Sequence, residues 1–392
     1  MNLALLKPEA QKFIANHINE FAIDLILSGS PFLDVDIKEL VAQIVAKQKC
    51  KNKLPTWYKK LNIYYPNKIN IAQASSEITA NYKAILIKGG NKLIDITGGF
   101  GVDSYAFSLK FKEVTHCEID SELSKIATYN FKTLQRFNIK TIVGDGLAYL
   151  KQKKEKYDWI FIDPSRRTAN NKRVFLLNQC KPDITLHINL LFEYANNILI
   201  KLSPLLDISK TIKDLKFVKE IHCIAVNNDV KETLFVLEKN YQSEIKIKSL
   251  NIAKKESQIF EYKYNKEPRL NCNFILNYLY EPNAAIMKIG GFNHLARQLG
   301  IYKLHANTNL FTSKDLIDFP GRRFKIIKEF GFNKRKIKEF LPNGKANIST
   351  RNFPVNSSQL HKKLKIKTGG SDYLFFYTDK EERHRVALCY KV

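Results

Sequence analysis

A short glycine-containing segment near residue 95 constrains the fold of this chain more than any other part of its sequence. Residues 93–103 read LIDITGGFGVD. The apolar residues predict a buried strand that ends at an acid, and the glycines let the backbone turn tightly and approach a ligand before a helix begins. The dinucleotide fingerprint G-x-G-x-x-G is not met, because its third position is Ser104. What fits is acidic-x-x-x-Gly-x-Gly, with a plain glycine turn as the simpler alternative.

The sequence around this segment alternates short apolar strands with amphipathic helices. A helix is expected at 74–87, and further helices at 121–137 and 146–150. Strands are expected at 93–96, 114–118, 140–143, 159–163 and 197–202. Such alternation indicates βαβ units and a parallel sheet. Strands at 221–226 and 233–237 have no helix between them and predict an antiparallel hairpin that closes one edge of the sheet.

Acidic residues follow the next two predicted strands. Glu118 ends the second strand, and Asp145 follows the third strand between two glycines. The carboxyl ends of parallel strands form the ligand edge of such a sheet, where a carboxylate can accept hydrogen bonds from a ligand. Asp120 lies two residues after Glu118 and is expected to cap the following helix.

The fourth predicted strand ends in Asp163-Pro164-Ser165-Arg166-Arg167. At the ligand edge, the Asp163 carboxylate and the carbonyls after it can accept hydrogen bonds from a substrate amine. The two arginines can bind a phosphate through paired N–H groups. The simpler alternative is a turn that ends the strand, followed by two solvated arginines.

The net charge of the chain indicates which kind of partner it could bind. The 392 residues include 64 Lys and Arg against 38 Asp and Glu, a formal charge of +26. Such a charge suits a polyanion, either nucleic acid or an anionic membrane, although a lysine-rich genome composition gives the same excess. In the C-terminal region, basic residues alternate with phenylalanines, which suits phosphate contacts with base stacking or, equally, a small core beneath a solvated face. These residues are Arg322, Arg323, Lys334, Arg335, Lys336, Arg351, Lys362 and Lys363, with Phe324, Phe330, Phe332, Phe340 and Phe353.

Other residue patterns exclude several protein classes. The six cysteines form no C-x-x-C pair and the eight histidines lack metal-ligand spacing, so we expect no metal site and a reducing compartment. The N-terminus, with Lys7-Pro8-Glu9, does not read as a signal peptide. No apolar run approaches the roughly 18 residues that a membrane span needs. We therefore expect a soluble cytoplasmic protein that spans no membrane.

The order of these motifs resembles that of class I S-adenosylmethionine-dependent methyltransferases, over about residues 70–240. The segments 163–167 and 73–83 are similar to a bacterial group of these enzymes that carries a THUMP-like C-terminal domain. In the tail the similarity is looser and rests on residues 351–354 and 369–373.

The resemblance implies an α/β fold with a Rossmann-like seven-stranded methyltransferase sheet. Apolar residues at three-to-four spacing predict an N-terminal helical region, and the turn-punctuated sequence from residue 278 onward predicts small C-terminal α+β modules. The expected boundaries are 1–68 for the helical region, 69–240 for the methyltransferase domain, 241–321 for a linker with a small ferredoxin-like module, and 322–392 for the THUMP-like domain that the resemblance implies. Residues 241–270 are expected to be linker or partly strand.

The resemblance also implies a role for each motif residue. The methionine end of the cofactor, S-adenosylmethionine, would lie against Asp95, Thr97, Gly98, Gly99 and Gly101. Glu118 would bind the ribose and Asp145 the adenine. Asp163, Pro164 and Ser165 would meet the atom to be methylated, and Arg166, Arg167 and Arg351 would bind the substrate. Ser75 and Ser76 would close over the cofactor or, equally, cap a helix.

One departure from the resemblance concerns the target base. Amine methyltransferases of this class often follow Asp-Pro or Asn-Pro with a second proline and a stacking aromatic, but Ser165 and Arg166 fill those places here. Another aromatic must then stack on a flipped base, with Phe175 and Tyr105 as candidates. Methylation at pyrimidine C5 needs a cysteine nucleophile, and a structural role is expected for the nearest one downstream, Cys180.

We therefore expect direct N-methylation of a base in structured RNA, above all tRNA. A methyltransferase acting on a protein or a small metabolite is one alternative. A non-catalytic RNA-binding protein that retains the cofactor fold is the other.

Overall fold

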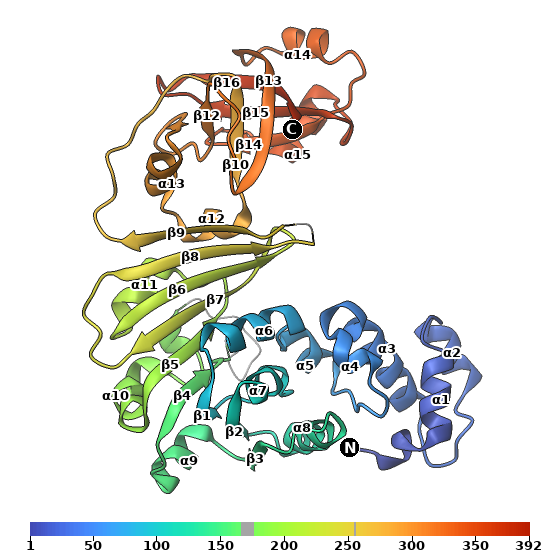
Figure 1. Ribbon diagram of the computed structural model, residues 1–392. Coiled ribbons are helices and arrows are strands. Elements are labelled where there is room, and N and C mark those ends of the chain that lie inside the picture. Colours follow the sequence, from blue (N-terminus) through green and yellow to red (C-terminus); the bar gives the residue numbers. More distant parts are fainter. Residues whose placement is uncertain (166–175, 255) are drawn as a thin grey trace. The chain divides into compact units, whose positions relative to one another are not determined.

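The computed structural model describes residues 1–165, 176–254 and 256–392 (Figure 1). It divides the chain into two compact units, one of residues 1–219 and 234–242 and the other of residues 220–233 and 243–392. Arg166, Arg167 and Phe175 lie outside the described residues, so the structure bears on none of the roles predicted for them.

The first unit begins with helices, as the apolar spacing predicts. They are η1 (Leu3–Leu6), α1 (Pro8–Asn16), α2 (Ala22–Ser28), α3 (Ile37–Lys53), α4 (Pro55–Lys59), α5 (Lys68–Gln73) and α6 (Glu77–Leu86). Prolines occupy the first positions of α1 and α4, where their missing N–H costs nothing. The helix expected from residue 74 begins at Glu77 instead, because Ser76 caps it by accepting the Thr79 N–H.

A parallel sheet follows in the first unit. Its strands are β1 (Gly90–Asp95), β2 (Phe111–Glu118), β3 (Ile139–Val143), β4 (Tyr157–Ile162) and β5 (Ala195–Leu202). β1 pairs in parallel with β2 and β4, β2 with β3, and β4 with β5. The helices after these strands are α7 (Val102–Ser108), α8 (Ser121–Thr133), α9 (Gly146–Lys153), α10 (Ile184–Tyr194) and α11 (Ile208–Asp214), with η2 (Leu177–Gln179) before α10. This arrangement confirms the predicted α/β fold class.

The predicted hairpin does not form the edge of the sheet. Its strands, β6 (Val218–Val226) and β7 (Asp229–Glu238), stand inside the strand order β3-β2-β1-β4-β5-β7-β6-β8-β9. β8 (Ile245–Ile252) pairs in parallel with β6, and β9 (Gln258–Tyr264) pairs antiparallel with β8. The segment expected to be linker or partly strand therefore contributes two strands. Its lysines conceal the strand pattern, since Lys246 and Lys248 alternate with apolar Ile245 and Ile247.

A second sheet, of seven strands, lies within the second unit and has the order β11-β12-β10-β13-β16-β15-β14. Its strands are β10 (Tyr278–Pro282), β11 (Tyr302–Lys303), β12 (Phe311–Ser313), β13 (Gly321–Gly331), β14 (Asn347–Arg351), β15 (Asp372–Thr378) and β16 (His384–Lys391). Its helices are α12 (Ala284–Ile289), α13 (Phe292–Leu299), α14 (Lys334–Phe340) and α15 (Ser357–Leu364), and the α14 ribbon is orange in Figure 1.

The phenylalanines that alternate with basic residues belong to the core of this second unit. Phe324 and Phe330 are buried, and Phe332, Phe340 and Phe353 pack partly buried against a cluster that includes residues of α14 and α15. The core alternative is therefore the correct one for these five rings. Across the described part of the chain, no helix is long and apolar enough to cross a membrane.

Candidate functional site

The glycine loop after β1 is fixed by two rings on which it packs. The Gly98 N–H donates to the Cys117 carbonyl (2.7 Å), and a Cβ on Gly98 would lie only 2.1 Å from the His116 ring. Gly101, which immediately precedes α7, has φ +88°, and a Cβ there would lie 2.4 Å from the Phe131 ring. Only glycine fits at both positions, because side chains at either would displace a buried ring.

Glu118 meets this loop at the end of β2. Its carboxylate accepts the Gly99 N–H (2.7 Å) and the Asp120 N–H (2.8 Å). A Cβ on Gly99 would have only the Thr97 carbonyl within 4.0 Å. Two residues predicted to bind the same ligand are thus brought together, beside open space.

Asp95 lies beneath the loop and is almost fully buried. Its carboxylate accepts the Thr97 N–H (3.1 Å) and the Ser104 hydroxyl (2.7 Å). Burial raises the pKa of Asp95 to about 7; the hydrogen bonds from Ser104 and Thr97 oppose this, whereas the nearby Asp103 and Asp163 carboxylates add to it. Asp95 therefore supports the loop from within and does not present its carboxylate to solvent.

Asp163 follows β4 at the same edge of the sheet. Its N–H donates to the Thr97 hydroxyl (2.7 Å), and its carboxylate pairs with the ammonium of Lys201 in β5. The Asp163 side chain remains 33% exposed, so it can still meet a substrate. Pro164 is buried, while the exposed Ser165 exchanges backbone hydrogen bonds with Lys181 (2.7 and 2.9 Å). Lys201 was not singled out from the sequence, although a lysine near the end of an apolar strand is itself unusual.

Asp145 is exposed and caps α9, where its carboxylate accepts the Ala148 N–H (2.8 Å).

Two apolar side chains that were not singled out from the sequence lie at the carboxyl ends of neighbouring strands. Ile119 after β2 is 73% exposed, and Val143 at the end of β3 is 58% exposed. A large apolar residue within two positions of each predicted acid was the available signal, since burial is the usual state of such residues.

The two serines before α6 have different partners. Ser76 caps α6, one of the two roles expected for it, whereas the buried Ser75 hydroxyl donates to Asp103 (2.7 Å). The fully buried Lys83 ammonium pairs with Asp103 (3.1 Å) and donates to Ser75 (3.0 Å). This charged network, also missed from the sequence, joins α6 to the first turn of α7.

Other residues singled out from the sequence have structural contacts. Arg351 at the end of β14 pairs with the buried Glu281 (2.7 Å), which also pairs with Arg322. The Tyr105 ring packs against that of Trp57, with centroids 5.6 Å apart. Cys180 is buried, in agreement with the structural role expected of it. Among the described residues, no group of three or more His, Cys, Asp or Glu is placed to hold a metal ion.

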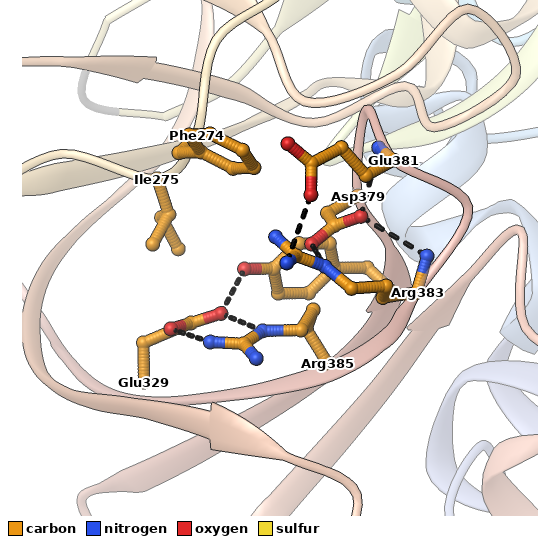
Figure 2. Close-up of a pocket in the computed structure, with 8 residues that line it drawn as sticks. Phe274, Ile275, Glu329, Asp379, Glu381, Arg383 and Arg385 are labelled. Carbon is orange, nitrogen blue, oxygen red and sulfur yellow. Dashed lines mark hydrogen bonds and ion pairs between the residues drawn. The ribbon is translucent and has the colours of Figure 1, made fainter.

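A pocket of about 400 Å³ lies in the second unit (Figure 2). Its lining consists of Phe274, Ile275, Glu329, Tyr377, Asp379, Glu381, Arg383 and Arg385. Glu329 pairs with Arg385 and accepts the Tyr377 hydroxyl (3.2 Å), and Arg383 pairs with Asp379 (2.9 Å) and Glu381 (2.8 Å). Because the acids and guanidinium groups of the wall pair with one another, its charges do not indicate a ligand.

Comparison with known proteins adds to this geometry. Residues 278–320 match a ferredoxin-like domain family, and residues 321–391 match a family described as THUMP domain-like. The crystal structure of a proposed methyltransferase from Porphyromonas gingivalis W83 is 28% identical, covers 97% of both chains and superposes with a TM-score of 0.86. An uncharacterized RNA methyltransferase from Mycoplasma mobile is 26% identical over 129 residues, which are 33% of this chain and 34% of the relative. The match thus spans about a third of that relative's length.

Proposed function

We infer that this chain, a class I methyltransferase with a THUMP-like C-terminal domain, transfers the methyl group of S-adenosylmethionine to RNA. The observation that carries the proposal is the convergence of the glycine loop, Glu118 and Asp163 at one edge of the sheet. The loop that would hold the cofactor and the acid that would hold the methyl acceptor thus lie side by side. The name of the Mycoplasma mobile relative and the basic C-terminal helices support RNA as the substrate.

The residues around the glycine loop suit this cofactor. Open space at Gly99 lets the methionine end approach the backbone. Each Glu118 oxygen accepts one backbone N–H and keeps a second lone pair, with which it would accept a ribose hydroxyl. Asp145 would accept the adenine amine, and the exposed Ile119 and Val143 side chains would supply apolar contacts to the ring.

Asp163 would position the methyl acceptor. The cofactor, when bound, supplies a methyl group already activated by the sulfonium charge. The Asp163 carboxylate, held by Lys201 while Thr97 anchors the backbone, would accept the N–H of a base amine and direct its lone pair toward that methyl group. Positioning and removal of water from the amine would supply most of the acceleration, without a covalent intermediate.

The second unit supplies a surface suited to phosphates. The exposed basic side chains of two of its helices are Lys334, Arg335, Lys336 and Lys338 on α14 and Lys362 and Lys363 on α15. We propose that they contact the RNA backbone, because neutralising several phosphates releases counterions. Arg351, predicted to bind substrate, is held by Glu281 and would contribute less than these exposed residues. Among structured RNAs we propose tRNA, in accord with the sequence analysis.

Nucleoside mass spectrometry of RNA from cells with and without the gene tests this proposal. We expect one methylated base to disappear from the tRNA fraction, and to return on expression of the wild-type chain but not of Asp163→Ala. Calorimetry on the Asp163→Ala protein should show nearly wild-type affinity for S-adenosylmethionine, because Asp163 acts on the acceptor.

Two other results would each point to a different function. Cofactor binding without any change in cellular RNA would redirect the search to a protein or metabolite substrate. No cofactor binding by the wild-type chain would instead favour an RNA-binding protein that has retained the fold.

A further inference from the structure

Ser104, which departs from the dinucleotide fingerprint, occupies a specific place in the structure. It lies in the first turn of α7 and is fully buried. Its hydroxyl donates to Asp95 Oδ2 (2.7 Å) and lies 3.0 Å from His116 Nδ1. Neither glycine nor alanine, the residues that the fingerprint allows, could make these two contacts.

His116 completes a chain of three polar groups beneath the glycine loop. Its ring is fully buried in β2 under Gly98, and its Nε2 has no hydrogen-bond partner within the described part of the chain. Asp95, Ser104 and His116 therefore form a buried hydrogen-bonded relay. We refer to these three residues as the Asp95 relay.

Counting protons gives the relay two states, because the Ser104 hydroxyl has only one proton to donate. When Asp95 is ionised, Ser104 donates to it, and His116 donates from Nδ1 to the Ser104 oxygen. When Asp95 is protonated, it donates to Ser104, which donates to His116 Nδ1, and the histidine proton is on Nε2. The two states differ by one proton and by the direction of both hydrogen bonds.

The charged groups around Asp95 leave its own charge uncompensated. Two neighbouring carboxylates have cations, since Asp103 pairs with the Lys83 ammonium (3.1 Å) and Asp163 pairs with Lys201. Asp95 has no such ion pair among the described residues. Its carboxylate accepts hydrogen bonds from neutral groups, namely the Ser104 hydroxyl and the Thr97 N–H and hydroxyl. An added positive charge would favour its ionised state more than that of the other two acids.

We propose that Ser104 and His116 are positioning residues that let Asp95 release its proton when the sulfonium cofactor binds, so that the site favours the cationic cofactor over its uncharged thioether product. This inference rests on the proposed function. S-adenosylmethionine carries one more positive charge than S-adenosylhomocysteine, so an ionised carboxylate beneath the loop attracts the former more strongly.

The buried position of Asp95 should make affinity for S-adenosylmethionine depend on pH near neutrality. Burial raises the pKa of Asp95 to about 7, so that both relay states are populated there. Because a bound cation favours the ionised state, affinity for S-adenosylmethionine should increase as pH rises toward this value and then level off. Affinity for S-adenosylhomocysteine should depend much less on pH.

Calorimetry on the full-length protein tests the proposal with both ligands, from about pH 6 to about pH 8.5, in two buffers that differ in ionisation enthalpy. We expect S-adenosylmethionine to release protons on binding and to gain up to about tenfold in affinity per pH unit below the midpoint. Equal pH dependence for the two ligands would overturn the proposal. This comparison uses the wild-type protein, so it does not depend on how a variant folds.

Variants separate the relay from a structural effect. Ser104→Ala should move the midpoint of the pH profile upward, because the Ser104 hydroxyl lowers the pKa of Asp95. Adding His116→Phe should cause no further shift, since His116 reaches Asp95 through Ser104. Ser108→Ala is the matched control. It removes another buried hydroxyl of α7, one that donates to the Tyr105 carbonyl (2.7 Å), and should leave the midpoint unchanged.

An unchanged midpoint in a folded Ser104→Ala protein would refute the relay while leaving the proposed function intact. If the wild-type protein bound S-adenosylmethionine at no pH, the proposed function would fail, and the relay would lose its role in cofactor discrimination.

Discussion

Replacing Asp95 by asparagine should change how the stability of the cofactor-free protein depends on pH. The amide has the shape of the carboxyl group. Its oxygen can accept the Thr97 N–H, and its NH₂ can donate to Ser104, which then donates to His116. The variant therefore keeps the relay in the arrangement of protonated Asp95 at every pH.

The magnitude follows from the shift at Asp95. Burial raises its pKa from 3.8 to about 7, roughly 3 units at 1.36 kcal/mol each, or about 4 kcal/mol as an upper limit. The folded state binds this proton more tightly than the unfolded chain does. The free energy of unfolding of the wild-type protein therefore falls as pH rises from about 4 to about 7, whereas Asp95→Asn lacks this loss.

Urea unfolding from about pH 5 to about pH 8 measures the difference. Tryptophan fluorescence follows the first unit, because both tryptophans of the chain, Trp57 and Trp159, belong to it. We expect the advantage of Asp95→Asn to grow by up to about 1.4 kcal/mol per pH unit until about pH 7 and then to stay constant. Asp120→Asn, at an exposed helix cap where asparagine serves equally well, is the control and should add no slope. A difference between Asp95→Asn and wild type that is the same at every pH would refute the reasoning.

Three further predictions concern packing, buried charge and thiol access. Gly98→Ala should lower the free energy of unfolding by about 1–3 kcal/mol, because its Cβ would collide with the His116 ring; adding His116→Ala should recover part of this in thermal unfolding. Lys83→Met should cost about 3–5 kcal/mol in urea unfolding by removing the ammonium from buried Asp103. Asp103→Leu in the same chain should restore most of this free energy, and the absence of any recovery would contradict a buried ion pair. In timed maleimide labelling followed by mass spectrometry, Cys272 should react first, since the other five cysteines are buried; earlier labelling of any of those five would contradict the structure.

Local patterns predicted the elements of the first unit but not the contacts between them. Strand periodicity and the glycines located β1, the loop and the acids at the strand ends, since each depends on neighbours in sequence. The partner of Asp163 could not be found in this way, because Lys201 meets it only where β4 and β5 lie side by side.

Charge and residue type alone do not reveal a partner that is distant in the sequence. Arg351 was predicted to bind substrate, but Glu281, 70 residues earlier in the chain, holds its guanidinium. Ser104 read as a departure from a motif because its two partners lie on different strands, β1 and β2. Such pairs require the fold before they can be recognised.

The pairing of β8 and β9 beyond β6 also determines where the chain can be shortened. β6 contributes Ile221 and Ile224, both fully buried, and a chain ending near residue 240 would lack the strands that pair with its outer side. Its unpaired backbone would then be an apolar sheet edge, the kind of surface on which aggregation begins. In the intact chain the last strand, β9, instead carries Glu261 and Lys263, which pair with Lys246 and Glu244. The lysine-rich stretch that resembles a spacer is thus the part that keeps this sheet soluble.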